Sequence, residues 1–377
     1  MKLVRTSTVP GSLETFCKGL LKELQGEGYE VVAVSAPGDA LSEIREREGV
    51  RTVEVPMERR ISPLKDLRSL WRMIRVFRKE KPDMVHSITP KAGLLSMIAG
   101  KICRVPVRIH TFTGLRFPTE VGFKKRLLKF TDALTCIFAT HIFAEGQGVK
   151  NDLIANHITK KNVQILGNGS INGVDTELFD PVIPELNERA RGLVDDSVFS
   201  FIFVGRLVGD KGLNELVEAF ALLNKENPKT RLLLLGEKEE ELDQLKKETW
   251  AEIETNPAIN YLGFNLDVRP YLCAADCLVL PSYREGFPNV VLEASSMELA
   301  CIVTDINGSN EIVVNGETGL IVQPRSVDEL RQAMISLAID KQKTKKMGME
   351  ARRRIIDLYN THILRTETRQ FYGTVLS

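Results

Sequence analysis

At 377 residues, with 43% hydrophobic and 27% charged residues, the chain has the length of two ordinary domains and the composition of a globular protein. No apolar run reaches the ~18 residues that a membrane-spanning helix needs, and the first residues lack the layout of a secretory signal, so a membrane-embedded or secreted protein is not expected. The net charge of +1 hides an asymmetry, because residues 1–175 carry 28 lysines and arginines against 18 acidic residues. We therefore expect two domains with different partners.

The six cysteines stand singly, mostly in apolar surroundings, which is typical of reduced thiols in a cytoplasmic chain. Cys273 and Cys277 have the spacing of half a zinc site, but no second pair accompanies them. The sequence therefore predicts no zinc site.

Strand patterns and amphipathic helix patterns alternate along the first half of the chain. We expect strands over residues 1–8, 29–35 and 50–55, with helices over residues 13–25 and 40–48 between them. This alternation predicts a parallel, doubly wound sheet.

Two basic amphipathic stretches follow. A helix over residues 62–79 has an apolar stripe that includes Leu64, Leu67 and Trp71, and the rest of its surface is basic. Residues 124–130 repeat the pattern on a shorter scale. Such helices can pack their apolar face on a sheet and leave their charges in water, or they can lie on an anionic membrane. In the second case a lipid that carries a pyrophosphate would complement the basic surface.

A histidine ends the strand expected at residues 107–110. Residues of buried type lead to His110, and a turn rich in hydroxyls and glycine follows it. At the carboxyl end of a parallel strand, an imidazole can hydrogen-bond a sugar hydroxyl or a departing phosphate. The alternative is a core histidine bonded to the backbone.

The second half opens with a strand over residues 198–204 and the turn Gly205-Arg206-Leu207-Val208-Gly209-Asp210-Lys211-Gly212. This turn lacks the endings of a Walker loop and of G-x-G-x-x-G. Two cations at a strand-to-helix turn suit a pyrophosphate, because arginine offers a planar fork and lysine a point charge. A polar linker is expected over residues 181–196, a charged helix over 237–254, and a hairpin over 315–320.

Two carboxylates eight positions apart mark the segment Glu285–Glu293. Glu285 follows a buried strand pattern over residues 277–282, and Pro288 stands just before an expected helix start. Glu285 should therefore lie on the loop at the carboxyl end of a strand, where open sheets bind ligands. The amides at the helix start can meet a phosphate, and Glu293 can accept from vicinal hydroxyls.

The spacing of Glu285 and Glu293 resembles the E-x7-E signature of retaining, nucleotide-sugar-dependent glycosyltransferases of family 4, which have the GT-B fold. Gly205, Arg206, Lys211 and Gly212 are similar to that family's G-R-h-x-x-x-K-G, and Asn172–Pro181 to its N-G-h-D…F-x-P. The resemblance covers nearly the whole chain. It implies an α/β protein with two Rossmann-like, doubly wound parallel-sheet domains facing a cleft. We expect a first domain at residues 1–180, joined by a crossover helix at about 360–377, and a donor domain at residues 181–359.

The resemblance also assigns roles to residues. Reaction chemistry is expected at four positions, namely His110, Arg206, Lys211 and Glu285. Donor binding is expected at Gly11, Gly205, Arg206, Lys211, Leu262, Gly286, Phe287, Asn289, Val290 and Glu293. No D-x-D occurs in the chain, so we expect neither a divalent metal nor another cofactor.

The function implied is transfer of a sugar from a nucleotide sugar, such as a UDP-sugar or UDP-N-acetylhexosamine, to a glycan or polyprenyl-pyrophosphate-linked acceptor in surface polysaccharide synthesis. The chain would then work in the cytoplasm, with the inner face of the cell membrane as a candidate partner. A soluble acceptor, a nucleotide-sugar 2-epimerase and a non-catalytic nucleotide-sugar-binding module remain alternatives. Nucleic-acid binding is not expected, because aromatic residues are not interleaved with the basic ones.

Overall fold

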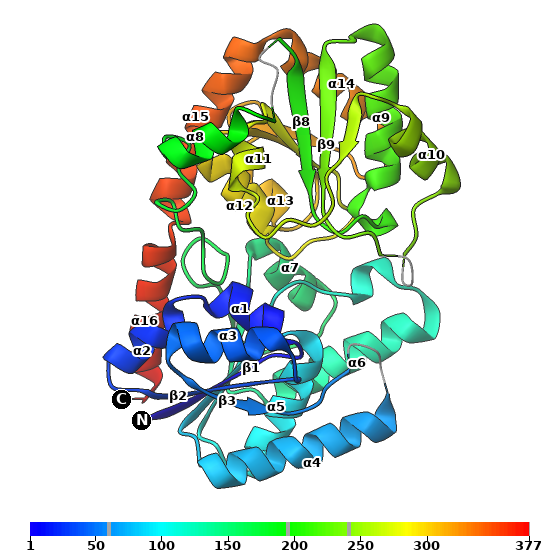
Figure 1. Ribbon diagram of the computed structural model, residues 1–377. Coiled ribbons are helices and arrows are strands. Elements are labelled where there is room, and N and C mark those ends of the chain that lie inside the picture. The colour runs from blue at the N-terminus through cyan, green and yellow to red at the C-terminus, as the bar shows by residue number, and fades with distance from the viewer. Residues whose placement is uncertain (59–61, 194–196, 240–242, 377) are drawn as a thin grey trace. The chain divides into compact units, whose positions relative to one another are not determined.

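The computed structural model describes residues 1–58, 62–193, 197–239 and 243–376 (Figure 1). The chain forms two compact units. The first contains Met1–Asn172 together with His362–Ser377, and the second contains Gly173–Thr361. Within the described residues, no helix has both the length and the apolar character needed to cross a bilayer.

The first unit is built on a seven-stranded sheet in the order β3-β2-β1-β4-β5-β6-β7. All its pairings are parallel, as the alternation of strands and helices predicts. The strands are β1 Lys2–Thr6, β2 Glu30–Ser35, β3 Arg51–Glu54, β4 Met84–Ile88, β5 Val107–Phe112, β6 His141–Ala144 and β7 Val163–Gln164.

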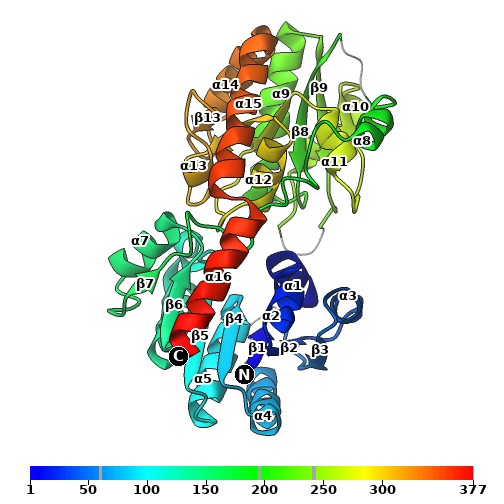
Figure 2. The ribbon, with the colours of Figure 1, turned by 90° about the vertical axis from the view of Figure 1, so that its left-hand side faces the viewer.

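Helices cover both faces of this sheet. One apolar cluster joins the sheet to α1, α2, α3 and the C-terminal α16, which Figure 2 shows lying over the strands. A second cluster joins the other face to α4, α5, α6 and α7. The helices are α1 Pro10–Cys17, α2 Leu20–Gly26, α3 Asp39–Glu48, α4 Pro63–Glu80, α5 Pro90–Ile102, α6 Gly122–Phe138, α7 Gln147–Ala155 and α16 Thr361–Leu376, with a 3-10 turn at Phe117–Thr119.

The single helix predicted over residues 13–25 is wrong. Gly19 adopts a left-handed backbone (φ +75°), and its N–H donates to the Glu48 carboxylate at 2.8 Å. The chain therefore breaks into α1 and α2, although both halves keep the predicted apolar face in the core.

The predicted apolar stripe of α4 is buried only in part. Met73 and Phe77 are the large apolar side chains that α4 buries. Leu64, Leu67 and Trp71 remain 80%, 63% and 54% exposed. The first half of the helix therefore does not bury its apolar side chains in the core.

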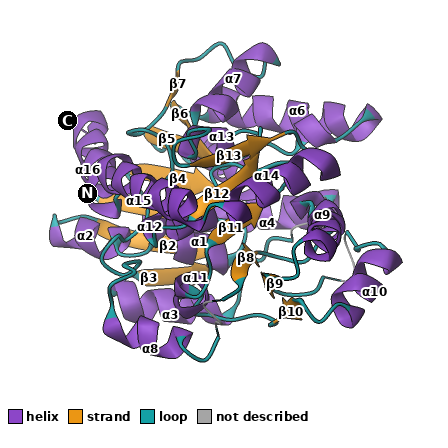
Figure 3. Cartoon of the chain, turned by 90° about the horizontal axis from the view of Figure 1, so that it is seen from above, coloured by secondary structure: helices purple, strands orange, loops and turns teal. Residues whose placement is uncertain are grey.

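The second unit contains a six-stranded, all-parallel sheet in the order β10-β9-β8-β11-β12-β13, which Figure 3 shows from above. Its strands are β8 Phe199–Val204, β9 Thr230–Leu235, β10 Ile259–Tyr261, β11 Cys277–Leu280, β12 Ala300–Thr304 and β13 Gly319–Val322. Helices flank it on both sides, at α8 Pro184–Ala190, α9 Leu213–Glu226, α10 Lys247–Thr255, α11 Arg269–Cys273, α12 Asn289–Ser296, α13 Ser309–Ile312, α14 Val327–Ile339 and α15 Lys341–Leu358, with a 3-10 turn at Gly209–Lys211.

Three local predictions in this unit need correction. The hairpin expected at residues 315–320 is a tight turn leading into β13, which pairs in parallel with β12. The charged helix expected over 237–254 begins only at Lys247, and residues 240–242 of that prediction lie outside the described part. The expected linker contains α8, because Leu186 is 3% exposed and belongs to the unit's core.

Candidate functional site

The candidate site lies where the strand order of the second sheet reverses direction. From β8 the chain continues to its neighbour β9, whereas from β11 it continues to β12 on the other side. β8 and β11 themselves pair in parallel, so their carboxyl ends meet at one edge of the sheet. Open α/β sheets bind ligands at such a reversal point. The turn 205–212 and the loop 281–288 follow these two strands.

The turn after β8 is held close to the loop after β11. Gly212 adopts a left-handed backbone (φ +72°), and a Cβ at this position would lie 2.0 Å from the carbonyl oxygen of Pro281. Only glycine tolerates both conditions. The helix α9 starts directly after Gly212, and Lys211 precedes it.

An ion pair joins the two sequence motifs. The Nζ of Lys211 lies 2.5 Å from Oε1 of Glu285. The two side chains are only 21% and 13% exposed, so solvent screens their interaction less than it screens a surface pair. The structure therefore brings together a cation and a carboxylate that the sequence places 74 positions apart.

Arg206 lies on the same turn and forms an ion pair with Glu239, a partner that the sequence did not indicate. Its side chain is 47% exposed, so the guanidinium can reach solvent and ligands. Gly205, which precedes Arg206, directly follows β8, and its N–H donates to the carbonyl of Leu235 at 2.9 Å.

A further network links the turn and the loop through Asp210. Its carboxylate accepts from Arg284 at 2.8 Å, and its carbonyl accepts from the N–H of Tyr283 at 2.9 Å. Sequence reasoning missed these three residues, although each adjoins or lies inside a motif that it named. Burial, with Glu215 as hydrogen-bond partner, raises the pKa of Tyr283 above its usual range, so the phenol stays protonated.

The helix α12 supplies the second half of the Glu285–Glu293 segment. It begins at Asn289, as expected from the sequence, and Val290 and Glu293 are half-buried on its first turns. Phe287 is 4% exposed and its ring lies 5.4 Å from that of Tyr359. Its side chain therefore belongs to the core, and only its backbone can face a ligand.

Two other predicted binding positions can contribute chiefly through their backbone. Leu262 packs against the core, and its N–H already donates to the carbonyl of Leu234 at 2.9 Å. Gly286 lies next to Gly308, where an added Cβ would come within 2.1 Å of the Gly286 carbonyl oxygen. The loop backbone is thus closely packed on its neighbour.

His110 belongs to the first unit and lies inside it, at 1% exposed. Its Nδ1 is 2.9 Å from the hydroxyl of Ser87, and its ring meets that of Phe112 edge-on. Burial lowers the pKa of His110 to about 3, so the imidazole is neutral. The burial is that of a core histidine, although its hydrogen-bond partner is a hydroxyl and not the backbone, and a role in the reaction stays a prediction.

Gly11 also belongs to the first unit. It is an exposed residue in the first turn of α1.

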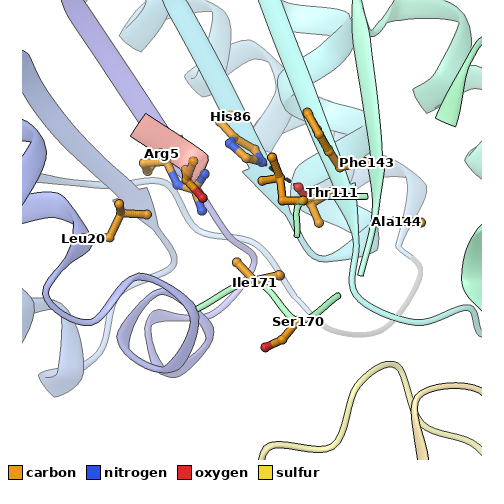
Figure 4. A pocket seen from close by; sticks show the side chains of 10 residues that line it. Arg5, Leu20, His86, Thr111, Phe143, Ala144, Ser170 and Ile171 are labelled. Atoms are coloured by element: carbon orange, nitrogen blue, oxygen red, sulfur yellow. Dashed lines mark hydrogen bonds between the residues drawn. The ribbon is translucent and has the colours of Figure 1, made fainter. Parts of the chain in front are cut away.

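A small pocket lies within this unit. Figure 4 shows Arg5, His86, Thr111 and Ser170 among the side chains that line it. Its volume of about 10 Å³ is room for a single water molecule and not for a nucleotide.

Among the described residues, no group of three or more histidine, cysteine, aspartate or glutamate side chains is placed to hold a metal ion. The six cysteines are free thiols. The cations and carboxylates of the second unit can offer a ligand charge neutralisation and hydrogen bonding.

Two family models match the chain, one to each half. Residues 11–169 match the model described as a glycosyl transferase 4-like domain, and residues 185–354 match the model described as glycosyl transferases group 1. A solved structure of Anabaena HepE in complex with UDP and glucose has the same fold, with a TM-score of 0.82, 18% identity, and coverage of 99% of this chain and 100% of that one.

Curated relatives match over nearly the full length. A capsular polysaccharide biosynthesis glycosyltransferase, CapM of Staphylococcus aureus, is 32% identical over 376 residues, which is 100% of this chain and 97% of the relative. An Escherichia coli enzyme named UDP-Gal:alpha-D-GlcNAc-diphosphoundecaprenol alpha-1,3-galactosyltransferase is 29% identical and covers 89% of this chain and 87% of its own. The chain therefore belongs to the retaining family 4 glycosyltransferases of the GT-B fold.

Proposed function

We propose that the chain transfers a hexose or N-acetylhexosamine from its UDP-sugar to a hydroxyl of a polyprenyl-diphosphate-linked sugar, at the cytoplasmic face of the cell membrane. The observation that carries the proposal is the Lys211–Glu285 pair, which joins the two donor motifs at the point where the second sheet reverses. The name of the E. coli relative supports the donor and the acceptor class. The free thiols suit the cytoplasm.

Stabilisation of the leaving group is the main contribution that we propose. When the bond between the anomeric carbon and the donor phosphate breaks, negative charge develops on the departing nucleoside diphosphate. Lys211 and Arg206 would neutralise that charge, and the amides at the start of α12 would add hydrogen bonds. Because Lys211, Arg206 and these amides would stabilise the departing diphosphate, the reaction would proceed without a divalent cation.

The carboxylates would serve the two ends of the donor. Glu293, on the second turn of α12, would accept hydrogen bonds from the ribose hydroxyls. Glu285 would orient the sugar and favour positive charge at the anomeric carbon. The acceptor hydroxyl would attack from the face that the phosphate leaves and pass its proton to that phosphate, which retains the configuration. His110, a residue of the first unit, would contact the donor sugar or the departing phosphate, and Gly11 would border the donor.

Removal of the lysine charge tests the proposal. We expect Lys211→Ala to lower kcat by about 10²–10³, the usual loss when one preorganised donor to a developing anion is removed. The measurement is transfer of radiolabelled sugar from UDP-sugars to a synthetic polyprenyl-diphosphate-linked sugar. The control is Lys229→Ala, which removes an exposed lysine directly before β9 and should keep full activity. Equal activity in both variants would contradict the role of Lys211.

Donor binding is measured separately, by thermal unfolding with UDP, GDP, ADP and CMP, with and without a chelator. Stabilisation by UDP that Glu293→Gln abolishes and the chelator leaves unchanged would support the donor class and the metal-free reaction. Binding of UDP-sugars without transfer to lipid-linked or soluble acceptors would point instead to a binding module. Stabilisation by another nucleotide alone would overturn the choice of UDP.

A further inference from the structure

Two helices of the first unit, α4 and α6, expose large apolar side chains that no described residue of that unit covers. α5 packs against both α4 and α6, so the three lie side by side on one face of the sheet (Figure 1). Leu64, Leu67 and Trp71 project from α4, and Val121 and Phe123 from the start of α6. All five are more than half exposed, and Val121 and Phe123 reach 82% and 79%.

The exposed charged side chains of α4 and α6 themselves are cations. The exposed charged residues of α4 are Lys65, Arg68, Arg72, Arg75, Arg78 and Lys79, and those of α6 are Lys124 and Arg126.

The acidic residues of the two helices are themselves paired or buried. Asp66 pairs with Lys91 at 2.6 Å, Glu80 is buried and pairs with Arg51, and Asp132 is buried. The neighbouring Glu58 and Glu120 pair with Lys65 at 2.5 Å and with Lys124 at 2.6 Å, so the charge of the face is carried by the other cations. The guanidinium of Arg75 stacks over the Trp71 ring at 3.8 Å, so cation and aromatic ring form one amphipathic element.

The apolar residues gather at one end of the layer. In a parallel sheet each crossover helix starts near the carboxyl edge, because it begins where the preceding strand ends. Leu64 and Leu67 lie in the first turns of α4, and Val121 and Phe123 lie at the start of α6. The surface therefore borders the sheet edge at which ligands of such folds bind.

We infer that this docking face, formed by Leu64, Leu67, Trp71, Val121, Phe123 and the cations around them, lies on an anionic lipid bilayer. Exposed aliphatic and aromatic residues flanked by arginine and lysine are the pattern of helices that lie in the membrane interface. Acidic headgroups complement the cations, whereas a second copy of the chain would bring two cationic faces together. The purpose of the contact rests on the proposed lipid-linked acceptor, and the contact itself is measured without donor or acceptor.

The test is flotation of the full chain with vesicles of neutral phosphatidylcholine and with vesicles that also contain phosphatidylglycerol. We expect binding to the anionic vesicles that falls as salt rises. Leu64→Ser, Leu67→Ser and Trp71→Ser combined should abolish it, and Arg72→Glu with Arg75→Glu should weaken it by about tenfold or more. A matched control replaces three exposed apolar residues of the second unit, Val182, Leu266 and Ile339, with serine, and it should bind as the parent does.

The pattern of binding among the variants shows whether the docking face binds lipid. Loss in the docking-face variants alone supports the inference, and thermal unfolding with UDP shows whether those variants are still folded. Equal binding by all variants, binding that ignores lipid charge, or no binding at low salt overturns it. A concentration-dependent dimer in analytical ultracentrifugation that the triple serine variant abolishes would assign the face to a second copy instead. If the chain transfers sugar but ignores vesicles, the inference falls while the proposed function stands.

Discussion

Arg5 is a fully buried cation whose partners are uncharged in the described part of the chain. Its guanidinium donates to the hydroxyl of Tyr372 at 2.7 Å and to the sulfur of Cys17 at 3.1 Å, while its Nε has no partner among the described residues. The same Tyr372 hydroxyl lies 2.5 Å from Nδ1 of His86. Burial, together with the charge of Arg5, lowers the pKa of His86 well below its usual range. Tyr372 thus satisfies two buried polar groups at once.

Removal of that hydroxyl should destabilise the first unit. We expect Tyr372→Phe to lower the free energy of unfolding by about 1–3 kcal/mol, because it leaves buried groups of Arg5 and His86 without a partner. Chemical denaturation measures the change. Tyr29→Phe, at a half-buried tyrosine of the same unit, should shift it by less than about 0.5 kcal/mol. A loss no larger for Tyr372→Phe than for Tyr29→Phe would show that the network contributes no stability.

At the scale of the element, α6 combines an exposed apolar and basic start with an unusual inner face. Leu128, Asp132, Thr135 and Cys136 are buried on the side that faces the sheet and α5. Asp132 is 7% exposed, and burial raises its pKa to about 7. A carboxyl group in this place is most stable when it is protonated, because desolvation disfavours the carboxylate.

The contribution of Asp132 to the stability of the protein should therefore fall as pH rises. Below about pH 4 the aspartic acid is neutral in both folded and unfolded chains, and between about pH 4 and 7 the unfolded chain loses its proton first. This favours unfolding by up to about 4 kcal/mol at pH 8, given a rise of about three pKa units at about 1.4 kcal/mol each.

Asp132→Asn should remove that dependence, since the amide stays neutral. The measurement is denaturant unfolding at pH 5 and pH 8, where we expect the variant to exceed the parent at pH 8 and approach it at pH 5. Asp357→Asn, at an exposed residue of α15, should retain the parent's pH dependence. An unchanged slope in Asp132→Asn would mean that water or a partner group solvates the carboxylate.

The sequence predicted most elements because their patterns are local. The alternation of strands and helices predicted the parallel sheet of the first unit, and the family resemblance implied the second. Gly205–Gly212 follows β8, and the segment from Glu285 to Glu293 runs from the loop after β11 into α12, as expected. The periodicity of a helix could not show which part of its apolar face packs against a neighbouring element. The stripe of α4 has helical spacing, yet its first half is exposed. The break at Gly19 depends on a carboxylate 29 residues away, which no local pattern records.

The candidate site divides in the same way. Residue types, turns and the family resemblance singled out Lys211 and Glu285, and the fold places them 2.5 Å apart, while their roles stay predictions. Glu239, the partner of Arg206, and Arg325, which lies over the ring of Tyr283 at 4.5 Å, come from distant segments that only the fold places there. The burial of His110 was also beyond the pattern, because it depends on Ser87 of the neighbouring strand and on α5.

At the scale of the whole molecule, the chain crosses from one unit to the other twice, and both crossings lie together within the second unit. The N–H of Val174 donates to the carbonyl of Tyr359 at 2.9 Å, and the N–H of Thr361 donates to the carbonyl of Val174 at 2.9 Å. The second unit therefore begins and ends at one place and encloses a core of its own. Arg206, Lys211, Glu285 and Glu293 all belong to it.

A fragment of residues 173–361 should consequently fold and bind the donor without transferring it. We expect one cooperative thermal transition, stabilised by about 2.7 kcal/mol when UDP is present at about 100 times its Kd. The same fragment with Glu293→Gln serves as the control and should show no shift. Transfer should be absent, because His110 and the proposed docking face belong to the first unit. If the full chain binds UDP while the folded fragment does not, residues of the first unit are needed to hold the nucleotide, and the donor site cannot be the property of one unit.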